Sequence, residues 1–150
     1  MSSPLLVDVE KFKRLALEQE GKPYIWGAKG GTCFDCSGLV TWAIREAGGP
    51  DWRMDHNCRA LWKKLERTGT PQGDEVALVF YGPPNAPNHV MLALGDGRVF
   101  GACGGNRDTV NLLTAARMGA KVRYRPVANY RHDLLGFCRL ALAPHLKGPP

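Results

Sequence analysis

The chain has 150 residues, of which 44% are hydrophobic and 23% are charged, and its formal net charge is +6. This length and composition are those of one globular domain that buries a core without needing disulfide staples. The positive charge favours an acidic partner, such as nucleic acid, an anionic membrane or the bacterial wall. The basic residues are scattered in short groups and no recognised nucleic-acid-binding motif accompanies them, so we expect no nucleic-acid partner.

Neither a membrane span nor a signal peptide is visible in the sequence. No apolar run is long enough to cross a bilayer, and the first residues, Met1-Ser2-Ser3-Pro4, lack the positive segment with which signal peptides begin. We therefore expect a soluble protein that is synthesised in the cytoplasm and has no membrane partner. We also expect a monomer.

The five cysteines are an odd number, which argues against a complete disulfide framework. Cys33 and Cys36 form a C-x-x-C pair that could serve redox chemistry or supply half of a zinc site. A zinc site would need a second close pair, and the other three cysteines stand alone. We expect neither a metal nor a cofactor.

Three amphipathic helices are predicted in the first half of the chain. The first covers residues 8–20. The second begins after Asp35 and stops at Gly48-Gly49, with apolar residues recurring on one helical face between them. The third begins near Cys58 and closes at Gly69. Its helical spacing explains Cys58 as a core residue, to which we assign no function.

The hydrophobic period then changes to that of strands. Strands are predicted over residues 76–81, 89–94, 98–102, 121–126 and 135–141. A short helix is predicted over residues 109–118, and Pro144 to Pro150 should form a frayed tail. No repeat or linker interrupts the chain. Helices followed by strands indicate a single α+β domain over residues 1–150, with its core at about 8–141.

Cys36 is a candidate nucleophile because it falls in the first turn of the second predicted helix. Unpaired N–H groups and the helix dipole favour a negative charge there, which lowers the pKa of a thiol and enlarges its thiolate fraction. Nucleophilic catalysis needs that thiolate. The alternative is that Cys36 is a small apolar residue packed under the helix.

His89 is the candidate base, since it opens a strand directly after the proline-rich loop of residues 82–88. A nucleophile on a helix, packed against a base on a sheet, is the arrangement of parts in papain. The alternative is an ordinary surface histidine at a strand end. His56, His132 and His145 are weaker candidates, because they lie beside charged residues or in the tail.

Four segments resemble, in order, the NlpC-type cell-wall peptidases. They are Gly21-x-Pro23-Tyr24-x-Trp26-Gly27, Phe34-Asp35-Cys36-Ser37-Gly38-Leu39-Val40, Gly73-Asp74, and His89-Val90 with Gly95-x-Gly97. This family consists of papain-like cysteine peptidases that cut the stem peptides of bacterial peptidoglycan. The resemblance covers roughly residues 15–102. It implies a papain-like fold in which N-terminal helices, including the nucleophile helix, pack on a C-terminal antiparallel β-sheet.

The resemblance also implies a role for individual residues. Cys36 matches the family nucleophile and His89 its general base. Tyr24 matches a tyrosine whose hydroxyl assists an oxyanion, together with the backbone N–H of Cys36. Asp35 and Ser37 match positions that hold the substrate's ammonium group in members that cut near a free amino terminus.

Each of these assignments has a structural alternative. Asp35 could be only an N-cap, although both roles can coexist. Tyr24 and Trp26, which we place in the oxyanion site and the substrate-binding site respectively, could instead pack in the core.

The family's third polar residue, usually twelve positions after the base, is replaced here by Gly101. Glycine has no side chain with which to orient an imidazole. Cys103, two positions further along the strand and therefore on the same face, is the candidate third member. Two alternatives remain: backbone groups alone orient His89, or Cys103 is simply a packed thiol.

The function that the resemblance implies is hydrolysis of a peptidoglycan stem-peptide bond, with γ-D-glutamyl–diamino acid as the expected bond and the stem peptides as the partner. Residues 101–135 resemble the phage-borne branch of the family, which predicts an endolysin or a tail-associated enzyme delivered to the bacterial cell wall by a bacteriophage. One alternative is an amidase or acyltransferase that uses the same Cys/His pair. Another is an inactive structural phage-tail or wall-binding protein.

Overall fold

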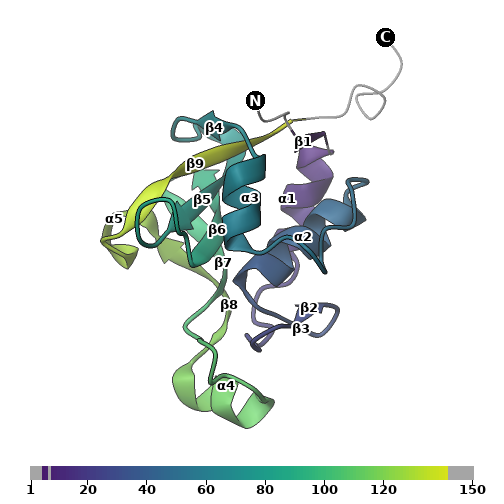
Figure 1. The fold of residues 1–150 in the computed structure, drawn as a ribbon, viewed down its shortest axis with the longest axis vertical. Coiled ribbons are helices and arrows are strands. Elements are labelled where there is room, and N and C mark those ends of the chain that lie inside the picture. The colour runs from purple at the N-terminus through teal and green to yellow at the C-terminus, as the bar shows by residue number, and fades with distance from the viewer. Residues whose placement is uncertain (1–4, 7, 142–150) are drawn as a thin grey trace.

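The computed structural model describes residues 5–6 and 8–141. Its main layer is a seven-stranded sheet with the order β1-β9-β5-β6-β7-β8, in which β4 also pairs with β9 (Figure 1). Paired strands run antiparallel except β1 and β9, which are parallel. These strands are β1 (Leu5–Leu6), β4 (Arg67–Thr68), β5 (Gly73–Tyr81), β6 (His89–Gly95), β7 (Arg98–Cys103), β8 (Lys121–Pro126) and β9 (Leu134–Ala141).

Three helices pack on one face of this sheet, and each starts at a polar cap. They are α1 (Val9–Leu17), α2 (Cys36–Glu46) and α3 (Cys58–Lys64). The caps Asp8, Asp35 and Asn57 each accept a hydrogen bond from the N–H three residues later, which satisfies one of the free donors of a helix start. A two-stranded ribbon, β2 (Lys29–Gly30) with β3 (Cys33–Phe34), leads into α2.

Two further helices lie in the second half of the chain. α4 (Leu112–Met118) belongs to a lobe that projects from the body between β7 and β8 (Figure 1). It ends at Gly119, whose φ of 66° is the left-handed conformation that glycine adopts at helix ends. α5 (Val127–Tyr130) follows β8 directly and packs on the sheet face opposite α1, α2 and α3.

Both faces of the central strands are buried, so β5 and β6 contain continuous apolar runs instead of an alternating pattern. Val90 and Leu92 belong to the core shared with the helices, whereas Met91 and Ala93 belong to a smaller cluster on the other face. The two-residue period of a strand produces this division. By the same period, His89 lies on the face of the smaller cluster.

The predicted α+β class, with N-terminal helices packed on a C-terminal antiparallel sheet, is confirmed. Some predicted boundaries were wrong. α1 ends at Leu17, and turns continue the chain to Gly21. α3 ends before β4, well short of Gly69. β5 starts at Gly73, because a bulge before Val76 lets the strand pair further back.

Three further predictions concern the tail, the absence of a membrane span and the number of domains. The predicted tail, Pro144 to Pro150, lies outside the described residues. Within residues 5–6 and 8–141, no helix combines the length and the apolar character that a bilayer crossing requires. The assignment of the whole chain to one domain stays a prediction.

Candidate active site

Asp35 fixes the start of α2 and with it the position of Cys36. Its Oδ1 accepts a hydrogen bond from the N–H of Gly38 at 2.6 Å, and its Oδ2 accepts one from the N–H of Gly27 at 3.0 Å. Glycine is required at position 38, because a Cβ there would lie 2.0 Å from the carbonyl oxygen of Ala28. The Asp-Cys-Ser-Gly segment therefore holds the Cys36 thiol at the first residue of the helix, where it is buried.

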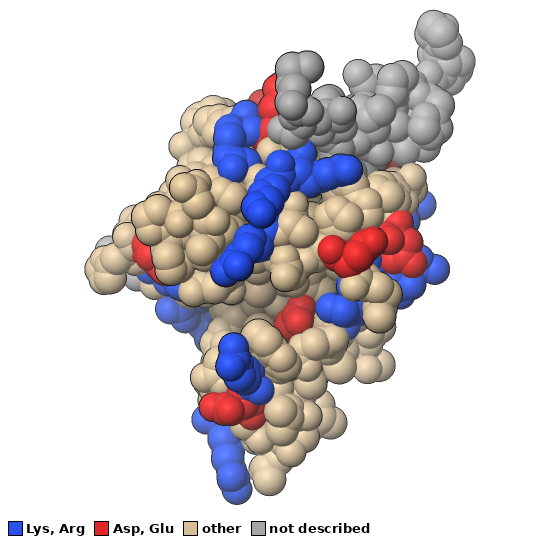
Figure 2. Space-filling model, in the orientation of Figure 1, with Lys and Arg blue, Asp and Glu red and all other residues tan. Residues whose placement is uncertain are grey.

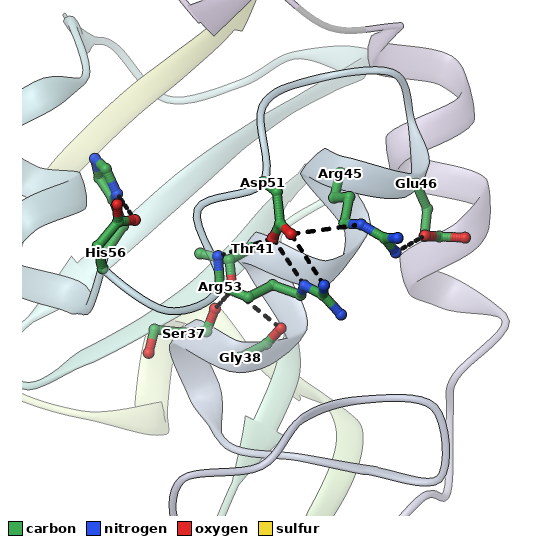
Figure 3. Close-up of polar contacts among 9 residues, drawn as sticks. Ser37, Gly38, Thr41, Arg45, Glu46, Asp51, Arg53 and His56 are labelled. Carbon is green, nitrogen blue, oxygen red and sulfur yellow. Dashed lines mark hydrogen bonds and ion pairs between the residues drawn. The ribbon is translucent and has the colours of Figure 1, made fainter.

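Polar contacts along α2 connect this helix to the segment that precedes α3 (Figure 3). Thr41 Oγ1 donates to the carbonyl oxygens of Ser37 at 2.9 Å and Gly38 at 3.3 Å. Asp51 lies 3.7 Å from Arg45 and 2.8 Å from Arg53. The hydrogen bond from Arg53 lowers the pKa of Asp51 to about 2, so this carboxylate stays ionised well below neutral pH.

The thiol of Cys36 lies beside His89, the first residue of β6. Both side chains are buried, with 8% and 7% of their surface exposed. The pKa of Cys36 is well below its ordinary value, chiefly because of a hydrogen bond with the Cys58 thiol and then because of the hydrogen bond and charge of His89. The backbone N–H of Val90 acts in the same direction, and burial opposes them. A thiolate paired with an imidazole is the nucleophile that acyl transfer needs.

Cys58 is the neighbour that the sequence analysis did not place in the site. The Sγ atoms of Cys58 and Cys36 are 3.5 Å apart. The bond to Cys36 raises the pKa of Cys58, so Cys58 keeps its proton and donates it toward the Cys36 sulfur. Cys58 is buried in the core, as its helical spacing predicted. That spacing contains no signal that the starts of α2 and α3 meet.

Tyr24 and Trp26 have different environments. Tyr24 is buried, and burial, followed by the charges of Cys36 and Asp35, raises the pKa of its phenol. Its ring packs on Gly105, where a Cβ would approach to 2.2 Å. Trp26 is 51% exposed, so the core-packing alternative for Trp26 is wrong. Ser37 is 8% exposed, which leaves its hydroxyl little access to solvent.

The Nε2 atom of His89 is hydrogen-bonded by Tyr130, which the sequence analysis missed. Tyr130 Oη lies 2.9 Å from His89 Nε2. Among the described residues, no hydrogen bond joins His89 to Cys103, whose thiol instead interacts with the Tyr130 hydroxyl. Tyr130 ends a four-residue helix 41 positions after His89, and so short a segment has no period by which its side chains could be placed.

His56, one of the weaker candidates for the base, lies just before α3 and contacts Asp55 and Trp52. Its Nδ1 lies 2.7 Å from Asp55 Oδ1, and its ring stacks on Trp52 at 4.3 Å between centroids. Over the part of the chain that the structure describes, no three His, Cys, Asp or Glu side chains gather as a metal site would need. The polar side chains described in the site are those of Cys36, Cys58, His89, Tyr24, Tyr130, Asp35 and Ser37.

A comparison with models of known protein families matches residues 21–127 to the NlpC/P60 family. The chain is 38% identical over 95 residues to the bifunctional muramidase/DL-endopeptidase CwlT of Bacillus subtilis, an alignment that covers 61% of this chain and 28% of CwlT. It is 32% identical over 127 residues to the peptidoglycan endopeptidase RipA of Mycobacterium tuberculosis, covering 76% and 23% respectively. The chain therefore spans about a quarter of the length of these relatives.

Solved structures have the same architecture. The P60 domain of the antigen MAP1204 from M. avium subspecies paratuberculosis superposes with a TM-score of 0.64 at 24% identity. The match covers 89% of this chain and 94% of that domain. The likeness extends over nearly all of both chains, so the fold is shared.

Proposed function

Because the chain belongs to the NlpC/P60 family, we propose that it is a cysteine peptidase acting on bacterial peptidoglycan, with Cys36 as nucleophile and His89 as general base. The observation that carries the proposal is the Cys36 thiol, held at a helix start beside an imidazole with its pKa lowered. CwlT and RipA, whose names describe endopeptidases, support the same substrate class.

The reaction would proceed through a thioester. The Cys36 thiolate attacks the peptide carbonyl carbon, and the oxygen becomes an oxyanion that accepts hydrogen bonds from the Cys36 N–H and the Tyr24 hydroxyl. The carbon–nitrogen bond then breaks as the amine takes a proton from His89. Water attacks the thioester carbon as His89 accepts the water's proton, and the carbon–sulfur bond then breaks. The product leaves with a free carboxyl group, and the Cys36 thiolate and the protonated His89 are restored.

The burial of Tyr24 supports its part in this scheme. A raised pKa keeps the Tyr24 hydroxyl protonated throughout the working pH range, so it can donate to a developing negative charge. The same burial that raises the pKa also excludes water, which strengthens the hydrogen bond.

The finer proposal is that the enzyme cuts the γ-D-glutamyl–diamino acid bond and recognises a free amino terminus through Asp35 and Ser37. Both carboxylate oxygens of Asp35 already accept an N–H, and each oxygen has a second lone pair for an ammonium group. Acetylating the amine of a muropeptide should lower kcat/KM, and Asp35→Asn should remove the difference. Equal rates on free and acetylated substrates would exclude this role.

The positive charge of the chain suits an anionic wall. Several lysine and arginine side chains of this face lie over α3, whose Arg59, Lys63 and Lys64 are exposed, and others lie on the lobe that carries α4 (Figure 2). The further proposal that the protein is a phage lysin or a tail-associated enzyme rests on the resemblance of residues 101–135 alone. Lysis of intact cells by added protein tests it.

The decisive experiment digests purified peptidoglycan and analyses the products by mass spectrometry. We expect new amino and carboxyl termini at one stem-peptide bond, and none with Cys36→Ala at an unchanged melting temperature. An added acceptor amine that appears in the product would indicate acyl transfer in place of hydrolysis. Digestion by Cys36→Ala would exclude the mechanism, and no digestion by the parent protein would exclude the activity.

A further inference from the structure

The imidazole of His89 is hydrogen-bonded by a residue of another element. Tyr130, at the end of α5, places its hydroxyl 2.9 Å from Nε2, and the two rings lie 5.8 Å apart at an angle of 56°. His89 thus interacts with the Cys36 thiol and with the Tyr130 phenol.

The strand beside His89 cannot supply this contact through position 101. β6 pairs with β7 in the register Leu92 to Phe100 and Ala93 to Val99, and Gly101 follows Phe100 along β7. A Cβ on Gly101 would lie 3.2 Å from Met91 Cγ. The side chain of Met91 therefore lies in tight contact with position 101. Glycine has no side chain with which to reach the imidazole, so an orienting side chain has to come from elsewhere.

Tyr130 is fixed by packing. Its ring meets that of Tyr81 edge-on at 5.4 Å, and the Arg125 guanidinium lies 5.2 Å from the Tyr130 ring centroid. These contacts restrict the Tyr130 ring, which limits the positions that its hydroxyl can adopt.

The residue after Tyr130 ties the end of α5 to the start of β6. Arg131 donates to Asp133 Oδ1 at 2.8 Å and to Asn88 Oδ1 at 3.2 Å. Asn88 directly precedes His89 in the chain. The tyrosine and the histidine are therefore linked twice, once through their side chains and once through Arg131.

We propose that Tyr130 is the positioning residue for His89 and takes the place of the third polar side chain that Gly101 lacks. This inference rests on the proposed role of His89. When the imidazole is protonated, Nε2–H donates to the Tyr130 oxygen, and the Tyr130 hydroxyl donates onward to the sulfur of Cys103. Cys103 thus affects His89 only indirectly, through its interaction with the Tyr130 hydroxyl.

Tyr130→Phe removes the hydroxyl and keeps the ring. The matched control is Tyr81→Phe, because the Tyr81 hydroxyl is buried on the same sheet face and has no hydrogen-bond partner among the described residues. We expect kcat on a muropeptide to fall about tenfold with Tyr130→Phe, equal to about 1.4 kcal/mol, with KM nearly unchanged. Tyr81→Phe should behave as the parent.

A second measurement needs no substrate. The rate of Cys36 alkylation as a function of pH reports the thiolate–imidazolium pair, which a merely structural change would not shift. Tyr130→Phe should slow alkylation at neutral pH about tenfold and move its rise to higher pH, while Tyr81→Phe leaves the profile in place. In the parent, ¹⁵N-labelled His89 should show an Nε2 signal typical of a hydrogen bond, which Tyr130→Phe removes.

Two outcomes would overturn the inference. One is a Tyr130→Phe alkylation profile that superposes on that of the parent, and the other is an equal loss with both substitutions. Failure of the parent protein to cut peptidoglycan would remove the proposed function. The alkylation profile would still decide whether Tyr130 positions His89, so the two failures are distinguishable.

Discussion

Cys36 owes its low pKa first to a second thiol and only then to the histidine. The Cys58 sulfur lies 3.5 Å away in a buried site, where a hydrogen bond to a charged group is stronger than in water. Thiols are weak donors, so the effect depends on close approach and on burial. At the residue scale, the reactivity of the site therefore depends on a side chain whose position in the sequence indicates only packing.

Removing the Cys58 thiol should make Cys36 less reactive. With Cys58→Ala we expect Cys36 alkylation at neutral pH to slow about tenfold, because the thiolate loses a hydrogen bond worth roughly 1.5 kcal/mol. The hydrogen bond from Cys58 lowers the pKa of Cys36 in the parent. Without that bond the pKa of Cys36 rises, so the alkylation rate should increase only at higher pH. Mass spectrometry of the alkylated peptide measures both quantities.

Cys58→Ser retains a donor at this position and should recover most of the rate. The control is Cys138→Ala, which removes another free and fully buried thiol that lies beside Arg67 and has no described contact with Cys36. If Cys138→Ala slowed alkylation as much as Cys58→Ala, general loosening of the core would explain the effect.

At the scale of elements, the start of α2 depends on close contact between two backbones. Gly38 approaches the loop before β2 so nearly that a methyl group would overlap the carbonyl of Ala28. The Asp35 carboxylate spans the same gap with its two hydrogen bonds. The helix that carries the nucleophile and the loop that carries Tyr24 and Trp26 therefore form one packed unit.

Gly38→Ala should disrupt this unit. We expect a loss of about 3 kcal/mol in the free energy of unfolding, as for a badly overpacked core position. For a chain of this length that corresponds to a fall of roughly 6–12 °C in Tm. Gly69→Ala is the control, since nothing lies within 4 Å of a Cβ there, and its effect should stay within about 0.5 kcal/mol. Equal Tm values for the two variants would contradict the close approach.

The sequence predicts those elements whose apolar pattern extends over more than one period. α2 and the strands β5 and β6 have long apolar patterns and were placed within a few residues. β1 to β4 contain two residues each and α5 contains four, so none of them completes a pattern that could be recognised. The positions of β1 and β4 depend on β9, a partner that is distant in the chain.

The same limit applies to the site. The family resemblance predicts from the sequence that Cys36 and His89 form the catalytic pair, because each lies in a recognisable local motif. The contacts from Cys58 and Tyr130 arise only when two helix starts meet and when α5 crosses the second sheet face. Neither event follows from local spacing. The search for a third member along β7 therefore led to Cys103, while the group that contacts the ring comes from α5.

At the scale of the whole molecule, the helix that carries the exposed basic side chains also borders the site. α3 begins at Cys58, beside Cys36, and presents exposed basic side chains along its length (Figure 2). The same face is hollowed between α3 and the lobe that carries α4 (Figure 2). A polyanionic wall attracted to α3 would thus be brought close to the thiol.

Neutralising two of these charges should weaken wall binding but not catalysis. For Arg59→Gln with Lys63→Gln we expect several-fold weaker sedimentation with peptidoglycan at low salt, and a smaller difference at high salt because salt screens exposed charges. kcat on a soluble muropeptide should not change. Lys11→Gln with Arg117→Gln, which removes equal charge from α1 and α4, is the control. Equal losses in both pairs would mean that only net charge matters.

The short distance between the two sulfurs also makes the site sensitive to oxidants. The sulfurs are 3.5 Å apart, and a disulfide bond of about 2.05 Å would need them to approach by roughly 1.5 Å. Hydrogen peroxide would convert the Cys36 thiolate to a sulfenic acid with release of hydroxide, and the Cys58 thiol would then displace water to form the disulfide. Peroxide should therefore inactivate the protein with the loss of two hydrogens from its mass, and dithiothreitol should restore activity. Cys58→Ser cannot form this bond, so peroxide should carry its Cys36 on to the sulfinic acid, which dithiothreitol does not reverse.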